Sequence, residues 1–136
     1  LHRYIRRQRQ MCIRDSVHAI SHMIGAEYNT QHGLTNAIIL PVVLRFNLPG
    51  MEDKVKRMGE AMELEDLSVE DFITEIERRL DEIDIPRSLS EISVPKGCEE
   101  RIARKALLDS AARTNPRAAS LAEMCLLVKT SLNKAR

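Results

Sequence analysis

The sequence is poor in aromatic residues and contains no tryptophan. Aromatic residues make up 3% of its 136 residues, so a single-domain core has to be built mainly from aliphatic side chains. No apolar run reaches the ~18 residues of a membrane-spanning helix, and we expect no membrane partner. The three cysteines, Cys12, Cys98 and Cys125, are odd in number and widely spaced, which argues against a disulfide framework. Free cysteines fit a reducing compartment, so we expect a cytoplasmic protein.

The opening segment is rich in arginine but does not look like natural protein sequence. Arginine-rich starts are typical of mitochondrial presequences and of basic arms that bind nucleic acid. The string RRQRQMCIRDS instead resembles the translation of a transposase adapter used in sequencing libraries. We therefore predict that residues 1–16 are a non-native, adapter-derived segment and that the native sequence starts near Ser16 or Val17, inside a longer gene.

Excluding this segment changes the charge balance of the chain. Residues 1–15 hold five of the 21 basic residues and one of the 20 acidic residues. The remainder has 16 basic and 19 acidic side chains, which gives a net charge of −3. The basic patch that would attract phosphates is lost, so we predict no nucleic-acid partner.

The rest of the sequence predicts an all-α fold. Apolar residues recur every three or four positions, as on one face of a helix, and no segment alternates convincingly with a period of two. The stretch Gly33–Asn47 is apolar almost all round, which is typical of a buried helix, and Pro41 is expected to kink it. We expect five or six helices packed around this central helix.

Local signals predict where the other helices begin and end. Gly25 is expected to follow the last residue of the first helix. A methionine-rich stripe over 51–62 predicts an amphipathic helix, and Pro95 is expected in the first turn of a later one. Two further helix starts match the capping box, at Ser68 with Asp71 and at Ser120 with Glu123.

Histidine is scarce, yet three of the four histidines lie close together at His18, His22 and His32. If Val17–Ile24 is the end of a helix, the spacing of four puts His18 and His22 on one face of it. A polar loop over 26–32 would bring His32 back against that face. Neutral imidazole is a common ligand of iron, zinc, nickel and copper in proteins.

The histidine cluster alone does not identify a metal site. Many pairs spaced by four residues only pack or cap, and a catalytic metal usually needs at least three protein ligands. No acidic residue of this segment has an obvious ligand role, because Glu27, the one candidate, is typical of a solvated loop residue. The residues by themselves leave both a metal site and structural histidines open.

The segment VHAISHMIGAEYNTQHGLTNAIILPVVLRFN closely resembles the signature of the iron-containing (group III) alcohol dehydrogenases. The family pattern is H-A-x-x-H-x-x-G-x-x-Y-x-x-x-H-G-x-x-N-A-x-x-L-P. It is matched here by His18, Ala19, His22, Gly25, Tyr28, His32, Gly33, Asn36, Ala37, Leu40 and Pro41. Further on, ALLDSAARTNPRAASLAEM resembles the family's A-x-x-D…N-P-R segment. The resemblance implies a helical bundle like the C-terminal, dehydroquinate synthase-like α domain of these enzymes.

The resemblance also implies what the histidines do. His18 and His32 correspond to two of the four metal ligands, and His22 corresponds to a catalytic histidine beside the metal and the nicotinamide. The other two ligands, an Asp and a His, are expected on a helix before Val17. The implied metal is Fe²⁺, although Zn²⁺ or Ni²⁺ would suit imidazoles equally well. The implied coenzyme is NAD or NADP, bound by an N-terminal dinucleotide-binding domain that is missing from the chain.

Residues 17–136 are therefore expected to form part of the C-terminal metal-binding domain of a homo-oligomeric oxidoreductase. The implied reaction transfers a hydride between NAD(P) and a small primary or secondary alcohol or aldehyde, and the chain alone, without its N-terminal domain, is expected to be inactive. The alternative is a non-catalytic helical interaction module with structural histidines. A metal hydrolase ranks last, because its helical histidine pair usually encloses a glutamate that acts as general base.

Overall fold

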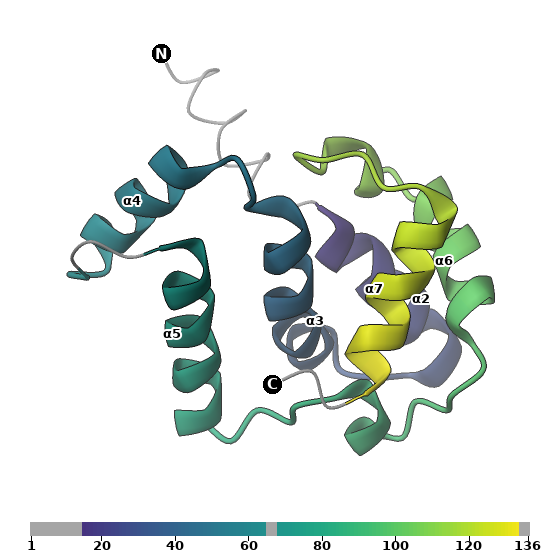
Figure 1. Cartoon of the computed structure of the whole chain (residues 1–136). Helices are drawn as coiled ribbons and strands as arrows, with labels where there is room; N and C mark the ends of the chain where they lie inside the picture. The colour runs from purple at the N-terminus through teal and green to yellow at the C-terminus, as the bar shows by residue number, and fades with distance from the viewer. Residues whose placement is uncertain (1–14, 65–67, 134–136) are drawn as a thin grey trace, which may run out of the picture.

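The computed structural model describes residues 15–64 and 68–133, and within them every regular element is a helix (Figure 1). Residues 1–14, most of the predicted adapter-derived segment, lie outside the described residues. The α-helices are α2 (Ser16–Tyr28), α3 (His32–Asn47), α4 (Glu52–Ala61), α5 (Val69–Glu82), α6 (Glu99–Leu108) and α7 (Leu121–Leu132). Two short 3-10 helices are η1 (Leu89–Ile92) and η2 (Ala112–Thr114). The predicted all-α fold is confirmed.

Helix α3 runs through the middle of the molecule and contacts α2, α5 and α7 (Figure 1). Because its apolar residues lie on all sides, it has to be covered by more than one neighbour. Ile38, Ile39 and Val43 are at most 2% exposed. The helix continues through Pro41, which lies inside its bounds. The prediction of a central buried helix is therefore confirmed.

Two apolar clusters lie on different sides of α3. The larger cluster joins α2, α3, α6 and α7 and is mainly aliphatic, as the composition requires; its fully buried members include Ile20, Ile24, Ile39, Ile102, Met124 and Val128. The smaller cluster joins the end of α3 to α4 and α5 through Leu48, Val55, Phe72 and Ile73. The methionines of the predicted stripe over 51–62 pack at the edge of this smaller cluster.

The two helix starts predicted from capping boxes are confirmed. The predicted end of the first helix and the predicted start of a helix near Pro95 are wrong. Ser68 and Ser120 cap α5 and α7 through reciprocal bonds with the residue three positions on. Helix α2 does not end near Gly25 but continues to Tyr28, because Asn29 adopts the left-handed conformation (φ 53°) that asparagine tolerates. Pro95 lies in the connector before α6, which begins only at Glu99.

The start of α2 is fixed by Asp15 and Ser16. The Asp15 carboxylate accepts hydrogen bonds from the backbone N–H groups of Val17 (2.9 Å) and His18 (3.4 Å). Ser16 is 1% exposed. Aspartate is among the best N-cap residues by its chemistry alone. The last two residues of the predicted adapter segment thus suit a helix start whatever their origin.

Asn115, the asparagine of the N-P-R segment, joins three segments of the chain. Its Oδ1 accepts hydrogen bonds from the Ser16 N–H (3.1 Å) and from Asn47 Nδ2 (2.9 Å). Its Nδ2 donates to Asn47 Oδ1 (2.8 Å) at the end of α3. Nearby, the Arg117 guanidinium lies 4.1 Å from the centre of the Phe46 ring and pairs with Glu123 at 2.8 Å. The N-P-R segment therefore connects the start of α2, the end of α3 and the start of α7.

Replacing Asn115 with alanine is expected to lower the free energy of unfolding by roughly 2–3 kcal/mol, because Asn47 and the Ser16 N–H would be left buried without partners. Urea unfolding followed by circular dichroism measures the loss. Asn133→Ala, an exposed position at the end of α7, is the matched control and should change stability by less than about 1 kcal/mol. Equal effects of the two substitutions would contradict the role given to Asn115.

Glu27 is not the solvated loop residue that the sequence suggests. It lies in the last turn of α2, where its carboxylate meets Lys105 Nζ at 2.6 Å and Arg101 Nε at 3.0 Å, both from α6. The hydrogen bond from Lys105, together with that from Arg101, lowers the pKa of Glu27. Glu27 therefore holds α2 against α6 and is already paired, which removes it as a candidate metal ligand.

Glu27→Gln is expected to lower the free energy of unfolding at pH 7 by roughly 0.5–1 kcal/mol, the range of partly exposed ion pairs. Since folding lowers this pKa, the stabilisation is present above the unfolded-state pKa of ~4.3 and is lost as pH falls through the folded value. Urea unfolding of both proteins between pH 7 and pH 3 should show the difference shrink as the pH falls below the unfolded-state pKa. A difference that stays constant down to pH 3, or an equal loss in the exposed control Glu60→Gln, would contradict this.

Candidate functional site

The structure brings the three clustered histidines together at the junction of α2 and α3. His18 and His22 lie one turn apart on α2, with ring centroids 6.0 Å apart. His32 is the first residue of α3, and its ring centroid lies 5.5 Å from that of His18 and 5.4 Å from that of His22. The spacing of His18 and His22 and the short connection to His32 produce this arrangement, as the sequence predicts.

His18 carries a buried nitrogen without a hydrogen-bond partner. The ring is partly enclosed, with 23% of the side chain exposed, and its Nδ1 is among the buried polar atoms that lack a partner. The nearest carboxylate oxygen, Asp15 Oδ1, is 3.7 Å from Nδ1, too far for a hydrogen bond. Buried polar atoms in native proteins usually have partners, so this nitrogen is suited to a ligand.

Both ring nitrogens of His32 have partners within the chain. Asn36, one turn further along α3, donates from Nδ2 to His32 Nε2 at 3.0 Å. Nε2 therefore carries the lone pair, and Nδ1–H donates to Ser21 Oγ at 3.1 Å. Desolvation, and then the neighbouring rings of His18 and His22, lower the pKa of His32. A lowered pKa favours neutral imidazole, the form that binds metal ions.

A cavity of about 200 Å³ opens beside His18, between the start of α2 and the first turns of α3. Asn36 also lines it, and Asn36 Oδ1 is a second buried polar atom without a hydrogen-bond partner. The other lining residues are Asp15, Val17, Ala37 and Leu40. Two unpartnered polar atoms therefore belong to residues on the wall of one small cavity at the histidine cluster.

His22 has a partner that sequence reasoning missed. Asp109, at the end of α6, places its Oδ2 3.0 Å from His22 Nδ1. The ring of His22 also lies nearly parallel to that of His32, with 18° between the planes. Asp109 is the aspartate of the A-x-x-D segment. The family pattern therefore includes this residue, but nothing in the sequence predicts its contact with His22.

The donors present fit part of a metal centre. Two imidazoles that share one ion through nitrogens about 2.1 Å from it have ring centroids roughly 4.5–5.7 Å apart, and both His18–His32 at 5.5 Å and His22–His32 at 5.4 Å fall in this range. Within residues 15–64 and 68–133, no three His, Cys, Asp or Glu side chains are arranged to hold one ion together. Two of these three imidazoles could hold one ion together, and a complete catalytic site would need at least one further ligand.

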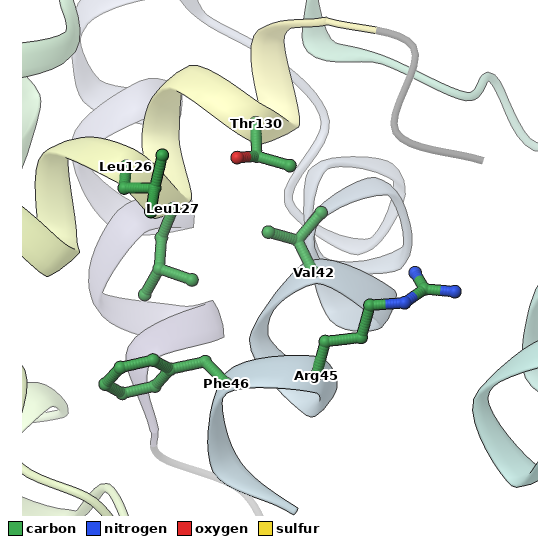
Figure 2. A pocket seen from close by; sticks show the side chains of 6 residues that line it. All are labelled: Val42, Arg45, Phe46, Leu126, Leu127 and Thr130. Atoms are coloured by element: carbon green, nitrogen blue, oxygen red, sulfur yellow. The ribbon is translucent and has the colours of Figure 1, made fainter. Parts of the chain in front are cut away.

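A second, larger cavity of about 270 Å³ lies away from the histidines, between α3 and α7. Figure 2 shows its lining: Val42, Arg45 and Phe46 from α3, and Leu126, Leu127 and Thr130 from α7. Arg45, the one ionisable side chain among the described residues that line it, is paired with Glu70 and Glu77 of α5 at 2.8 and 2.6 Å. This cavity is mainly apolar and contains none of the predicted site residues.

No described helix is both long and apolar enough to serve as a membrane span. The two described cysteines, Cys98 and Cys125, are free and lie outside the histidine cluster, whereas Cys12 is outside the described residues.

Comparison with known proteins identifies relatives along almost the whole chain. The family model for the C-terminal part of Fe-containing alcohol dehydrogenases matches residues 12–132. The NAD-dependent methanol dehydrogenase of Bacillus methanolicus is 30% identical over 122 residues, and the lactaldehyde reductase of Escherichia coli K12 is 32% identical over 121. Both alignments cover 85% of this chain. A crystal structure of 1,3-propanediol oxidoreductase superimposes with a TM-score of 0.81 and 31% identity over 87% of the chain.

The chain spans about a third of each of these relatives, namely 32% of their length. The family match covers the histidine cluster and the N-P-R segment, and it begins inside the segment predicted to be adapter-derived. The chain belongs to the iron-containing alcohol dehydrogenase family and corresponds to its C-terminal helical part.

Proposed function

We propose that residues 17–136 are the metal-holding part of an NAD(P)-dependent alcohol dehydrogenase, with residues 1–16 non-native. In this proposal His18 and His32 are metal ligands and His22 exchanges a proton with the substrate. A dinucleotide-binding domain earlier in the parent protein supplies the coenzyme site and the remaining ligands. The short coverage of the relatives, 32% of their length, supports a parent that is much longer than this chain.

The observation that carries the proposal is the meeting of three imidazoles from two helices. His18 has a buried nitrogen without a partner, and the His32 ring has a lowered pKa and an Nε2 lone pair that a metal ion could take over from the Asn36 amide. Structural histidines would be expected to have their buried nitrogens satisfied. The alternative, an interaction module with structural histidines, leaves the His18 nitrogen and the family match without an explanation.

Each side chain of the proposed site has a separate role. When bound, the metal supplies a Lewis acid to the alcohol or aldehyde oxygen, and the nicotinamide supplies or takes up the hydride. His32 is held in place because it begins the buried helix α3 and donates to Ser21. His22, half exposed at 41%, can move a proton between the substrate oxygen and solvent, because an imidazole is suited to proton transfer near neutral pH.

The substrate class proposed is small alcohols and their aldehydes, as the names of the methanol dehydrogenase and lactaldehyde reductase relatives suggest. Iron is proposed from the family, and NAD from the methanol dehydrogenase, with Zn²⁺, Ni²⁺ and NADP as the other outcomes to test. Homo-oligomeric assembly and a cytoplasmic location remain predictions, as does the absence of nucleic-acid and membrane partners.

In a full-length enzyme that contains residues 17–136, His18→Ala and His32→Ala are expected to lower metal content and activity together, because each removes a ligand. His22→Ala should lower kcat by about 10²-fold or more, the usual contribution of general acid–base catalysis, and leave the metal bound. Metal analysis and steady-state kinetics on the same preparations measure both effects. Gln31→Ala, an exposed neighbour of His32, is the matched control. Equal metal loss in all three histidine variants would contradict the division of roles.

The chain by itself is expected to bind metal weakly and to show no turnover. Only two of the proposed ligands are present, and the sequence has no glycine-rich phosphate loop to hold a dinucleotide. Titration with Fe²⁺ and Zn²⁺, together with an assay of NADH oxidation by a short aldehyde, tests both points. The His18→Ala, His32→Ala double variant gives the background binding. Tight stoichiometric binding accompanied by turnover would show that the chain is complete as an enzyme and would overturn the proposal.

A further inference from the structure

We propose that Asp109 is the positioning residue of His22, fixing both the tautomer of its imidazole and the plane of its ring. The inference gives Asp109 a functional purpose only if His22 has the proton-transfer role proposed above. The geometry that supports it does not depend on that role, and the two can be tested separately.

The Asp109 carboxylate is itself held in a defined orientation. Asp109 follows the last residue of α6 and has an extended backbone (φ −67°, ψ 139°). Its Oδ1 accepts the backbone N–H of Ala111 at 2.7 Å, which closes a local turn of the kind that aspartate favours. Only 14% of its side chain is exposed. With Oδ1 fixed in this way, Oδ2 faces His22 on α2.

The contact sets the tautomer of His22. A carboxylate only accepts hydrogen bonds, so at 3.0 Å from Oδ2 the Nδ1 of His22 has to carry a proton. In neutral imidazole the lone pair then lies on Nε2, which is the nitrogen left to take up or give a proton. A histidine side chain free in water prefers the opposite tautomer, with the proton on Nε2. Asp109 therefore reverses the intrinsic preference of the ring.

A second contact fixes the ring plane. The His22 ring stacks on that of His32 at 5.4 Å and 18°, and it meets that of His18 edge-on at 73°. Because 41% of the His22 side chain is exposed, stacking alone leaves the ring free to turn over about its own axis. The bond to Asp109 removes that freedom, so Nε2 is presented in one orientation.

The competing explanation is an ion pair that only holds α6 against α2. The same two helices are already joined by Glu27 with Arg101 and Lys105, at their other contact. A purely structural pair would hold the same tautomer, because the Asp109 carboxylate accepts a hydrogen bond only from Nδ1–H. The tautomer therefore tests the contact, and the two explanations differ in catalysis: in the full-length enzyme, Asp109→Asn should lower kcat by at least about tenfold with the metal content unchanged if Asp109 positions His22, whereas an unchanged kcat in the folded variant would show a purely structural pair.

The test is nitrogen NMR of the isotope-labelled chain, without metal, at a pH about two units above the ordinary imidazole pKa of ~6.5, where the rings are neutral. The ring-nitrogen shifts distinguish N–H from a lone pair. In the unaltered chain we expect His22 to be protonated on Nδ1 by at least about tenfold over Nε2, since hydrogen bonds to a charged group are roughly twice as strong as neutral ones. A majority of the Nε2–H form would overturn the proposal without any variant.

Asp109→Asn then tests the cause. The asparagine Oδ1 can still accept the Ala111 N–H, whereas its amide nitrogen donates to His22 Nδ1. The ring should therefore switch to the Nε2–H form, and the ratio of Nδ1–H to Nε2–H should fall by at least about tenfold. Asp53→Asn, an exposed aspartate in the first turn of α4, is the matched control and should leave the ratio unchanged. An unchanged ratio in a folded Asp109→Asn chain would overturn the proposal.

Failure of this inference is distinguishable from failure of the proposed function. If His22→Ala leaves the activity of the full-length enzyme intact, the proton-transfer role is wrong, although the tautomer result on the chain still stands. If His22 is needed for activity but carries its proton on Nε2, the function stands and the positioning role of Asp109 is wrong.

Discussion

The burial of α3 is the constraint on which the rest of the structure depends. This helix has apolar side chains on all sides, so α2 and α7 cover part of it and α5 covers another part (Figure 1). The packing that removes Ile39 and Val43 from water also fixes the first turn of the helix. His32 begins that turn, and its position beside α2 is therefore a consequence of core packing. A site built on such a helix is more precise than one built on a loop.

Polar contacts decide how the other helices meet this core. Asn115 joins the start of α2 to the end of α3, and Glu27 joins the end of α2 to α6. With both ends of α2 held, His18 and His22 keep a fixed position relative to His32. The same docking of α6 on α2 carries Asp109 to His22. These polar residues, of which Asn115 and Asp109 belong to the family pattern, thus support the geometry of the site although they are remote from it in sequence.

Some polar atoms of the histidine site have hydrogen-bond partners within the chain, and others have none. His32 has partners on both ring nitrogens and His22 is bonded to Asp109, whereas His18 Nδ1 and Asn36 Oδ1 are buried without partners beside one cavity. Buried groups of this kind are uncommon in native proteins, and a bound water, ion or ligand is a usual reason for them. Their location supports the view that this chain provides part of a metal site whose other ligands come from elsewhere in the parent protein.

The sequence by itself determined the helices, the starts of α5 and α7, and the pairing of His18 with His22, because helical periodicity and the capping box depend on residues a few positions apart. It misplaced the end of α2, since either Gly25 or Asn29 can adopt the left-handed conformation and only the packed helix selects one. Only the tertiary structure decided the contacts of His22 with Asp109, of Glu27 with Arg101 and of Asn47 with Asn115. These partners are 87, 74 and 68 residues apart, and no local pattern specifies which helix faces which across a shared core.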